Sequence, residues 1–322
     1  MTPGKLLVGA TVLASSLGLS LSGVKAQEVK TQEPVPSTAS FKSGVDMVRV
    51  SAVVRDHKGR FVQDLRSHDF EVLSSGQKMP IADFRLDTSG ISVAVLFDVS
   101  GSMEGHLAPA REAASHVLSW MEASRDEAAI YTFDTHLDER VPFTIGLKTL
   151  PDALTQVVPF GATSLHDAIA LTARRVGERE GRRRAVIVMT DGADNASHLK
   201  PSDVSAIASG IDVPVYIFGI VPSIDNPSAD ASTHSVEANA FAGPLADLAA
   251  WTGGHVFVAS TPGQRSIAAR QIIDELRHQY IIAFESSGKP GWHPLVVRAR
   301  NKDLIVRARS GYIAGQSRPT AH

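Results

Sequence analysis

One apolar segment that ends in polar residues most constrains how this chain can fold. Residues 91–102 read ISVAVLFDVSGS, with an uninterrupted apolar run at residues 93–97. Such a run predicts a strand buried on both faces, which is typical of a parallel sheet covered by helices. The strand leads into Asp98, Ser100 and Ser102. Because ligands of such sheets bind beyond the carboxyl ends of the strands, we expect a functional site there.

The side chains of Asp98, Ser100 and Ser102 offer oxygen atoms without sulfur or imidazole. Carboxylate and hydroxyl oxygens suit hard divalent cations such as Mg²⁺, Mn²⁺ or Ca²⁺. Three ligands on one loop cannot fill an octahedral coordination sphere, so further oxygens should come from the ends of neighbouring strands. Two candidates have the right context: Thr163, in a turn before a predicted helix, and Asp191, directly after a second apolar run.

Residues 88–280 alternate apolar strands with amphipathic helical segments. Helices are predicted at residues 108–123, 165–180, 245–251 and 264–279, and strands at residues 128–133, 185–189, 213–220 and 255–258 in addition to the first. This alternation predicts an α/β domain with a doubly wound, mostly parallel sheet.

The segments on either side of this domain have a β pattern. Residues 45–87 and 281–314 contain short extended runs separated by turn residues such as Ser75-Gly76 and Asn301-Lys302-Asp303. Each segment is too short to bury a core alone. We therefore predict that they pair into one small β-sandwich-like module into which the α/β domain is inserted, with residues 315–322 as a tail.

The composition excludes several classes of protein. The chain of 322 residues has 32 basic and 34 acidic residues, so its charge gives no reason to expect nucleic acid as a partner. It has no cysteine, which excludes disulfides, thiolate metal sites and cysteine nucleophiles. The one compact basic run, Arg182–Arg184, is interpreted as the solvated end of a helix and its loop.

The N-terminus is typical of an exported protein. Lys5 precedes an apolar run at residues 6–21, and Val24-Lys25-Ala26 resembles a cleavage site. We predict a signal peptide at residues 1–26, a flexible leader at residues 27–44, and a periplasmic or extracellular location without a membrane span after cleavage. Retention of the apolar run as a membrane anchor is the alternative.

Three motifs together resemble the metal-ion-dependent adhesion site of von Willebrand factor A (VWFA) domains. They are D-V-S-G-S at residues 98–102, the threonine of G-A-T-S-L-H-D-A at residues 161–168, and T-D-G at residues 190–192. The resemblance covers roughly residues 88–280. The flanking segments, including H-D-F-E-V at residues 68–72 and R-A-R-S-G-Y at residues 307–312, are similar to exported bacterial VWFA-related proteins of the acidobacterial type.

The resemblance implies a metal site and a partner. It implies that one Mg²⁺, or Mn²⁺ or Ca²⁺ in its place, is held by five residues: Asp98, Ser100, Ser102, Thr163 and Asp191. A Glu or Asp carboxylate of a protein ligand would complete the coordination, as in adhesion or protein-protein interaction at the cell envelope. The chain would then not be an enzyme.

A metal-dependent hydrolase or phosphatase with Asp98 as nucleophile is the alternative function. Phosphatases of the haloacid dehalogenase type have a second aspartate two positions after the nucleophile, where this chain has Ser100. A hydrolase would also need a general base beside the metal, for which Glu104, His106 and His166 are the candidates. We expect His166 to pack at the rim of the site. The segment Pro222–Gly243 is predicted to be an irregular loop of undefined role.

Overall fold

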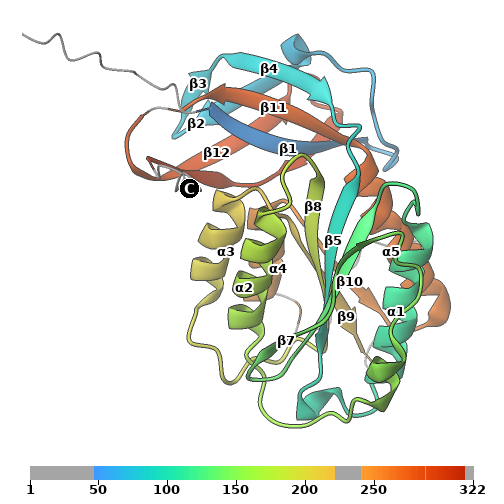
Figure 1. Ribbon diagram of the computed structural model, residues 1–322. Coiled ribbons are helices and arrows are strands. Elements are labelled where there is room, and N and C mark those ends of the chain that lie inside the picture. The colour runs from blue at the N-terminus through green and yellow to red at the C-terminus, as the bar shows by residue number, and fades with distance from the viewer. Residues whose placement is uncertain (1–46, 222–240, 242, 287, 316–322) are drawn as a thin grey trace, which may run out of the picture. The chain divides into compact units, whose positions relative to one another are not determined.

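The structure is a computed structural model that describes residues 47–221, 241, 243–286 and 288–315. The predicted signal peptide and leader lie outside these residues, as do residues 316–322 of the predicted tail. Most of the predicted loop Pro222–Gly243 also lies outside them. Within the described part, an α/β domain and a β module can be distinguished (Figure 1).

A six-stranded sheet forms the α/β domain, in the order β10-β9-β8-β5-β6-β7. Its strands are β5 (Ile91–Asp98), β6 (Glu127–Phe133), β7 (Leu137–Ile145), β8 (Arg183–Thr190), β9 (Val215–Ile220) and β10 (Val256–Ala259). All neighbouring strands are parallel except β7, which runs antiparallel to β6. The predicted mostly parallel sheet is confirmed.

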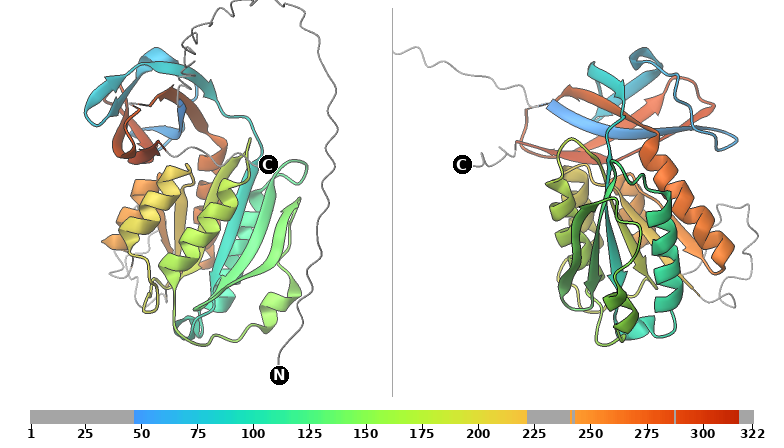
Figure 2. Two further views of the ribbon diagram at one scale, coloured as in Figure 1. Left: turned by 60° about the vertical axis from the view of Figure 1, so that its left-hand side comes forward. Right: turned by 45° about the vertical axis from the view of Figure 1, so that its right-hand side comes forward.

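Helices cover both faces of this sheet, as Figure 2 shows. They are α1 (Leu107–Trp120), α2 (Leu165–Gly177), α3 (Pro201–Gly210), α4 (Pro244–Thr252) and α5 (Pro262–Arg277). Alternate residues of β5 explain the arrangement, because Val93, Val95 and Phe97 pack in one apolar cluster with α1 and α5. Ala94 and Leu96 pack in a second cluster with α2, α3 and α4. Strand β5 is therefore buried on both faces, and the sheet is doubly wound.

Two elements of the domain, β7 and α3, occur where the sequence predicted none. Strand β7 is an edge strand with mostly exposed residues and a proline at position 142, so it has no apolar run to reveal it. Helix α3 is short and rich in small residues. It starts at Pro201, and Asp203 accepts a hydrogen bond from the backbone N–H of Lys200 (3.0 Å).

The β module consists of two antiparallel sheets, in the orders β13-β1-β11-β4 and β14-β12-β2-β3. Its elements are β1 (Met47–Asp56), the 3₁₀ helix η1 (Ser67–Asp69), β2 (Phe70–Ser74), β3 (Gln77–Met79), β4 (Ile81–Leu86), β11 (Gln279–Glu285), β12 (Gly291–Ala299), β13 (Leu304–Ala308) and β14 (Gly311–Ala314). Strand β1 lies between β11 and β13, and β2 pairs with β12. Each sheet thus combines strands from before and after the α/β domain around one apolar cluster.

Charged side chains join the β module to the amino ends of the parallel strands. Glu275 of α5, only 3% exposed, forms ion pairs with Arg55 of β1 (2.8 Å) and Arg307 of β13. Arg309 is buried and donates hydrogen bonds to the backbone carbonyls of Ser209 and Arg49. These contacts hold the module at one end of the sheet and leave the carboxyl ends of the strands at the other end.

The interpretation of Arg182–Arg184 as a solvated run is wrong for its central residue. Arg183 begins β8, is 3% exposed, and donates hydrogen bonds to the carbonyls of Arg277 (3.1 Å) and Ser89. Because these acceptors are distant in sequence, the run itself gives no sign of this burial. The guanidinium of Arg183 thus binds both segments that connect the β module to the α/β domain.

We expect Glu275→Ala to lower the free energy of unfolding by about 3 kcal/mol, because removing one member of a buried ion cluster leaves its partners uncompensated. Urea denaturation would measure the loss. Asp274→Ala is the matched control. Among the described residues, the side chain of Asp274 pairs only with the exposed Arg270 (3.4 Å), so its loss should cost less than about 1 kcal/mol. Equal losses in the two variants would contradict a structural role for the Glu275 cluster.

Candidate metal centre

The predicted site begins where β5 ends. Asp98 is the last residue of β5, and the following loop includes the 3₁₀ helix η2 (Gly101–Met103) before α1 starts at Leu107. Asp98 and Ser100 are fully buried, whereas Ser102 is exposed. The loop therefore has two polar side chains inside the protein and one at its surface.

The carboxylate of Asp98 is enclosed by hydrogen-bond donors. Its Oδ1 accepts from the backbone N–H of Ser100 (3.0 Å) and from the Ser100 hydroxyl (2.6 Å). Its Oδ2 accepts from the hydroxyl of Thr190 (2.7 Å). The hydroxyls of Ser100 and Ser102 lie 3.1 Å apart. These contacts bring Asp98, Ser100 and Ser102 together.

Thr190 is a site residue that the sequence analysis missed. It is the last residue of β8 and fully buried. The register of β5 and β8 pairs Phe97 with Met189, so the next residues, Asp98 and Thr190, lie side by side. The position of Thr190 directly before Asp191, at the end of an apolar strand, was the signal that could have identified it.

The electrostatic state of Asp98 is unusual for an aspartate. Burial raises the pKa of its carboxyl from 3.8 to about 6; the hydrogen bonds from Ser100 and Thr190 oppose this shift, and the nearby charge of Asp191 adds to it. Among the described residues, no cationic side chain forms an ion pair or a hydrogen bond with this carboxylate. A buried carboxylate of this kind fits a bound cation, which would supply the missing positive charge.

Thr163 lies on a second loop that is fixed against the first. The backbone N–H of Gly101 donates to the carbonyl of Gly161 (3.0 Å), and Gly161 has a φ of +84°, a conformation that favours glycine. The side-chain oxygen of Asn195 accepts from the backbone N–H of Thr163 (2.8 Å), whose carbonyl accepts from the N–H of Asn195 (3.0 Å). Thr163 itself is 1% exposed. Its loop is thus tied to both neighbouring loops.

Asp191 begins the third loop, directly after β8. Its Oδ1 accepts a hydrogen bond from the backbone N–H of Ala193 (3.0 Å), and its side chain is partly exposed. Its charge acts on the carboxyl of Asp98. The five predicted residues therefore come from three loops at the carboxyl end of one sheet, and hydrogen bonds join these loops.

The other polar residues near the site have separate roles. His166 Nδ1 lies 2.5 Å from the carboxylate of Asp194, which also accepts from the backbone N–H of His166 (2.9 Å). This pair fixes the start of α2. Glu104 is exposed at the end of η2.

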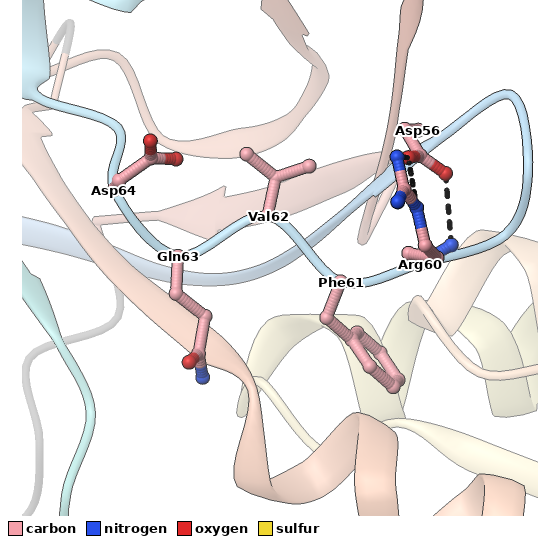
Figure 3. A pocket seen from close by; sticks show the side chains of 6 residues that line it. All are labelled: Asp56, Arg60, Phe61, Val62, Gln63 and Asp64. Carbon is pink, nitrogen blue, oxygen red and sulfur yellow. Dashed lines mark hydrogen bonds and ion pairs between the residues drawn. The ribbon is translucent and has the colours of Figure 1, made fainter.

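The described residues contain no cluster of three or more His, Cys, Asp or Glu side chains that could hold a metal ion. A site at Asp98 would accordingly depend on hydroxyl oxygens in addition to its two carboxylates. A hollow of about 470 Å³ lies elsewhere, on the β module (Figure 3), where Arg60 pairs with Asp56. None of the five predicted ligands lines that hollow.

Among the described residues, no helix combines the length and the apolar character needed to cross a membrane.

Comparisons with known proteins give a family and several similar structures. Residues 93–193 match the family model described as von Willebrand factor type A domain. No match was found among curated proteins. The conserved hypothetical protein BatB from Bacteroides thetaiotaomicron is 20% identical, with a TM-score of 0.46, over 58% of this chain and 98% of that one.

Two further solved structures are similar at lower identity. The von Willebrand factor type A protein from Catenulispora acidiphila is 12% identical over 86% of this chain and 76% of that one, with a TM-score of 0.46. Proximal thread matrix protein 1 from the mussel byssus, in a structure with a zinc-occupied MIDAS motif, is 18% identical. The similarity covers 63% of this chain and 50% of that one, with a TM-score of 0.44. The family match itself covers residues 93–193 of the 322.

Without metal, Asp98→Asn should make the protein more stable than the wild type at pH 7.5. A pKa raised from 3.8 to about 6 means that burying the charged carboxylate costs about 3 kcal/mol above pH 6. The cost falls as the pH decreases from 6 and vanishes below 3.8, where the group is protonated in both states. The difference in unfolding free energy between the two proteins, measured in EDTA, should therefore decrease as the pH is lowered towards 4.

Asp126→Asn is the matched control for this comparison. Asp126 is also buried, but it binds Arg277 (2.8 Å) and the backbone N–H groups of Ile91 (2.9 Å) and Glu122 (2.7 Å). Its replacement should destabilise the protein, because Arg277 loses its partner. A wild type that is more stable in EDTA at pH 7.5 than Asp98→Asn would contradict an uncompensated charge at Asp98.

Proposed function

We propose that this chain, in which residues 93–193 match the von Willebrand factor type A domain, binds a protein ligand through a divalent metal ion, most simply Mg²⁺. The metal is held by Asp98, Ser100, Ser102, Thr163 and Asp191. The ligand supplies a Glu or Asp carboxylate. The protein acts as an interaction module and not as an enzyme.

The observation that carries this proposal is the buried carboxylate of Asp98. Burial and the charge of Asp191 raise the pKa of this carboxyl, and hydrogen bonds from two hydroxyls and one backbone amide lower it. None of these groups is a cation. Keeping such a group ionised inside the protein is costly unless a cation compensates for its charge. A divalent ion bound between Asp98 and Asp191 would do so, and the neighbouring hydroxyls of Ser100 and Ser102 are suitable hard ligands.

The residues of the site would have distinct tasks. Asp98 and Asp191 contribute the negative charge, while Ser100, Ser102 and Thr163 contribute neutral oxygens. Thr190 and the backbone N–H of Ser100 orient the Asp98 carboxylate. Two protein carboxylates only balance the charge of a divalent ion, and the other protein ligands are neutral, so an exchangeable water on the metal can be replaced by a carboxylate from outside. The exposed position of Ser102 leaves the solvent side of the site open to such a ligand.

We further propose that the protein is exported. The support is the sequence of residues 1–26, with Lys5 before an apolar run and the small residues Val24 and Ala26 around the cleavage site. An envelope or extracellular location would give access to protein ligands outside the cytoplasm. Adhesion and envelope protein assembly would both use this binding chemistry.

The alternative of a phosphatase with Asp98 as nucleophile has less support. Asp98 is fully buried, and its two oxygens together accept three hydrogen bonds. Phosphatases of the haloacid dehalogenase type also have a second aspartate two positions after the nucleophile, where this chain has Ser100. Loss of a metal-dependent phosphatase turnover in Asp98→Asn would nevertheless favour the enzyme.

Mg²⁺ should stabilise the wild type and fail to stabilise Asp98→Ala. At about 100 times its dissociation constant, a ligand of the native state adds about 3 kcal/mol, which is visible as a rise in melting temperature. The rise should weaken as the pH falls through about 6, because the metal requires the ionised carboxylate of Asp98. Asp126→Asn should keep the full Mg²⁺ response, and an equal response in Asp98→Ala would refute the site.

Capture of partners from an envelope extract should depend on both the metal and Asp98. The immobilised full chain is incubated with extract in Mg²⁺ or in EDTA, and the bound proteins are identified by mass spectrometry. We expect at least one protein that is retained by the wild type in Mg²⁺, lost in EDTA, and absent with Asp98→Ala. Identical protein sets under all conditions would argue against metal-bridged binding.

A further inference from the structure

Two apolar side chains are exposed beside the proposed metal site. Phe160 is 80% exposed and Val158 is 79% exposed, the highest values among the large apolar residues of the described chain. Exposing such side chains to water is unfavourable, so neighbouring examples beside a binding site indicate a contact surface. We refer to Val158 and Phe160 as the apolar ridge.

The apolar ridge is held firmly by the residues around it. The 3₁₀ helix η3 (Asp152–Gln156) precedes it, and there Leu154 is 2% exposed and its carbonyl accepts from Arg111 of α1 (2.9 Å). Val157 packs against the same apolar cluster as α1 and α5. Inward residues thus anchor the segment, while Val158 and Phe160 remain outside.

The apolar ridge is also joined directly to the metal loop. The backbone N–H of Phe160 donates to the carbonyl of Val99 (3.0 Å), the residue between Asp98 and Ser100. Phe160 lies three positions before Thr163 on the same loop. A ligand whose carboxylate reached the metal would therefore lie beside the apolar ridge.

The charges of the three site loops decide what kind of ligand fits. Residues 98–106, 157–168 and 190–199 contain five acidic residues and no lysine or arginine. Apart from histidines, these loops offer an acidic ligand no cationic side chain, so the proposed metal would be the main source of electrostatic attraction there. Additional affinity from these loops must come from contacts other than ion pairs, for which the apolar ridge is available.

We propose that the apolar ridge selects protein ligands in which the metal-binding Glu or Asp is flanked by a large apolar side chain. The flanking side chain packs against Phe160 and Val158 while the carboxylate binds the metal. This inference rests on the proposed function and adds to it the chemistry of the partner. Phe160 and Val158 act as specificity residues and do not bind the metal.

A peptide array tests this selection with the full chain as the soluble partner. Nine-residue peptides of Gly and Ser carry a central Glu and, at each flanking position in turn, Leu, Phe or Ser. In Mg²⁺, we expect the wild type to bind the best Leu or Phe peptides about tenfold more tightly than the Ser peptides. Phe160→Ser should lose this preference and keep the Mg²⁺-dependent rise in melting temperature. Val158→Ser is a second variant and should reduce the preference.

Ile145→Ser is the matched control. Ile145 is 57% exposed, and it pairs with Glu127 at the first residue of β6, at the opposite end of the sheet from the metal loops. This variant should bind all peptides as the wild type does. A preference equally weakened in Ile145→Ser would overturn the role of the apolar ridge.

The remaining outcomes separate the inference from the proposed function. Mg²⁺-dependent binding without preference for an apolar neighbour, or with a preference that survives in Phe160→Ser, overturns the inference alone. Absence of Mg²⁺-dependent binding to every Glu peptide overturns the proposed function and the inference with it. A wild-type dimer in light scattering that Phe160→Ser disperses would assign the apolar ridge to a second copy of this chain and also overturn the inference.

Discussion

A carboxylate buried at the end of the central strand sets the requirements that the surrounding loops satisfy. Strand β5 is covered by helices on both faces, so Asp98 at its end is placed inside the protein. Its oxygens must then find donors, which Ser100 and Thr190 provide. These donors are neutral, so they provide hydrogen bonds to the carboxylate oxygens but no positive charge. The position of Asp98 therefore follows from the fold, and the proposed metal ligand would compensate for its charge.

Other buried acidic side chains of this protein are paired with arginines. Glu275 pairs with Arg55 and Arg307, and Asp126 pairs with Arg277. These pairs lie at the amino ends of the strands or at the junction with the β module, where they hold segments distant in sequence together. Asp98 is at the opposite end of the same sheet, and no ion pair joins it to a cationic side chain of the described residues. This contrast with the structural ion pairs supports the proposal that Asp98 binds a ligand.

The sequence predicted much of this arrangement because its strongest signals are local. The apolar run of β5 followed by Asp98 and Ser100 defined both the sheet and the first loop. Thr190 escaped notice because its role depends on the register between β5 and β8, which the sequence does not display. Arg183 was taken for a solvated residue because its acceptors are backbone carbonyls distant in sequence. Strand β7 was missed because an exposed edge strand needs no apolar run.

Preorganisation explains why the three loops can function as one site. The contacts between Gly101 and Gly161, and between Thr163 and Asn195, involve backbone groups and form with the fold itself. A metal would therefore meet ligands that are already positioned, and little ordering entropy would oppose its binding. The same contacts hold Phe160 next to the metal loop. Coordination of a carboxylate and packing of its neighbour would then be parts of a single binding event, so neither alone would define the partner.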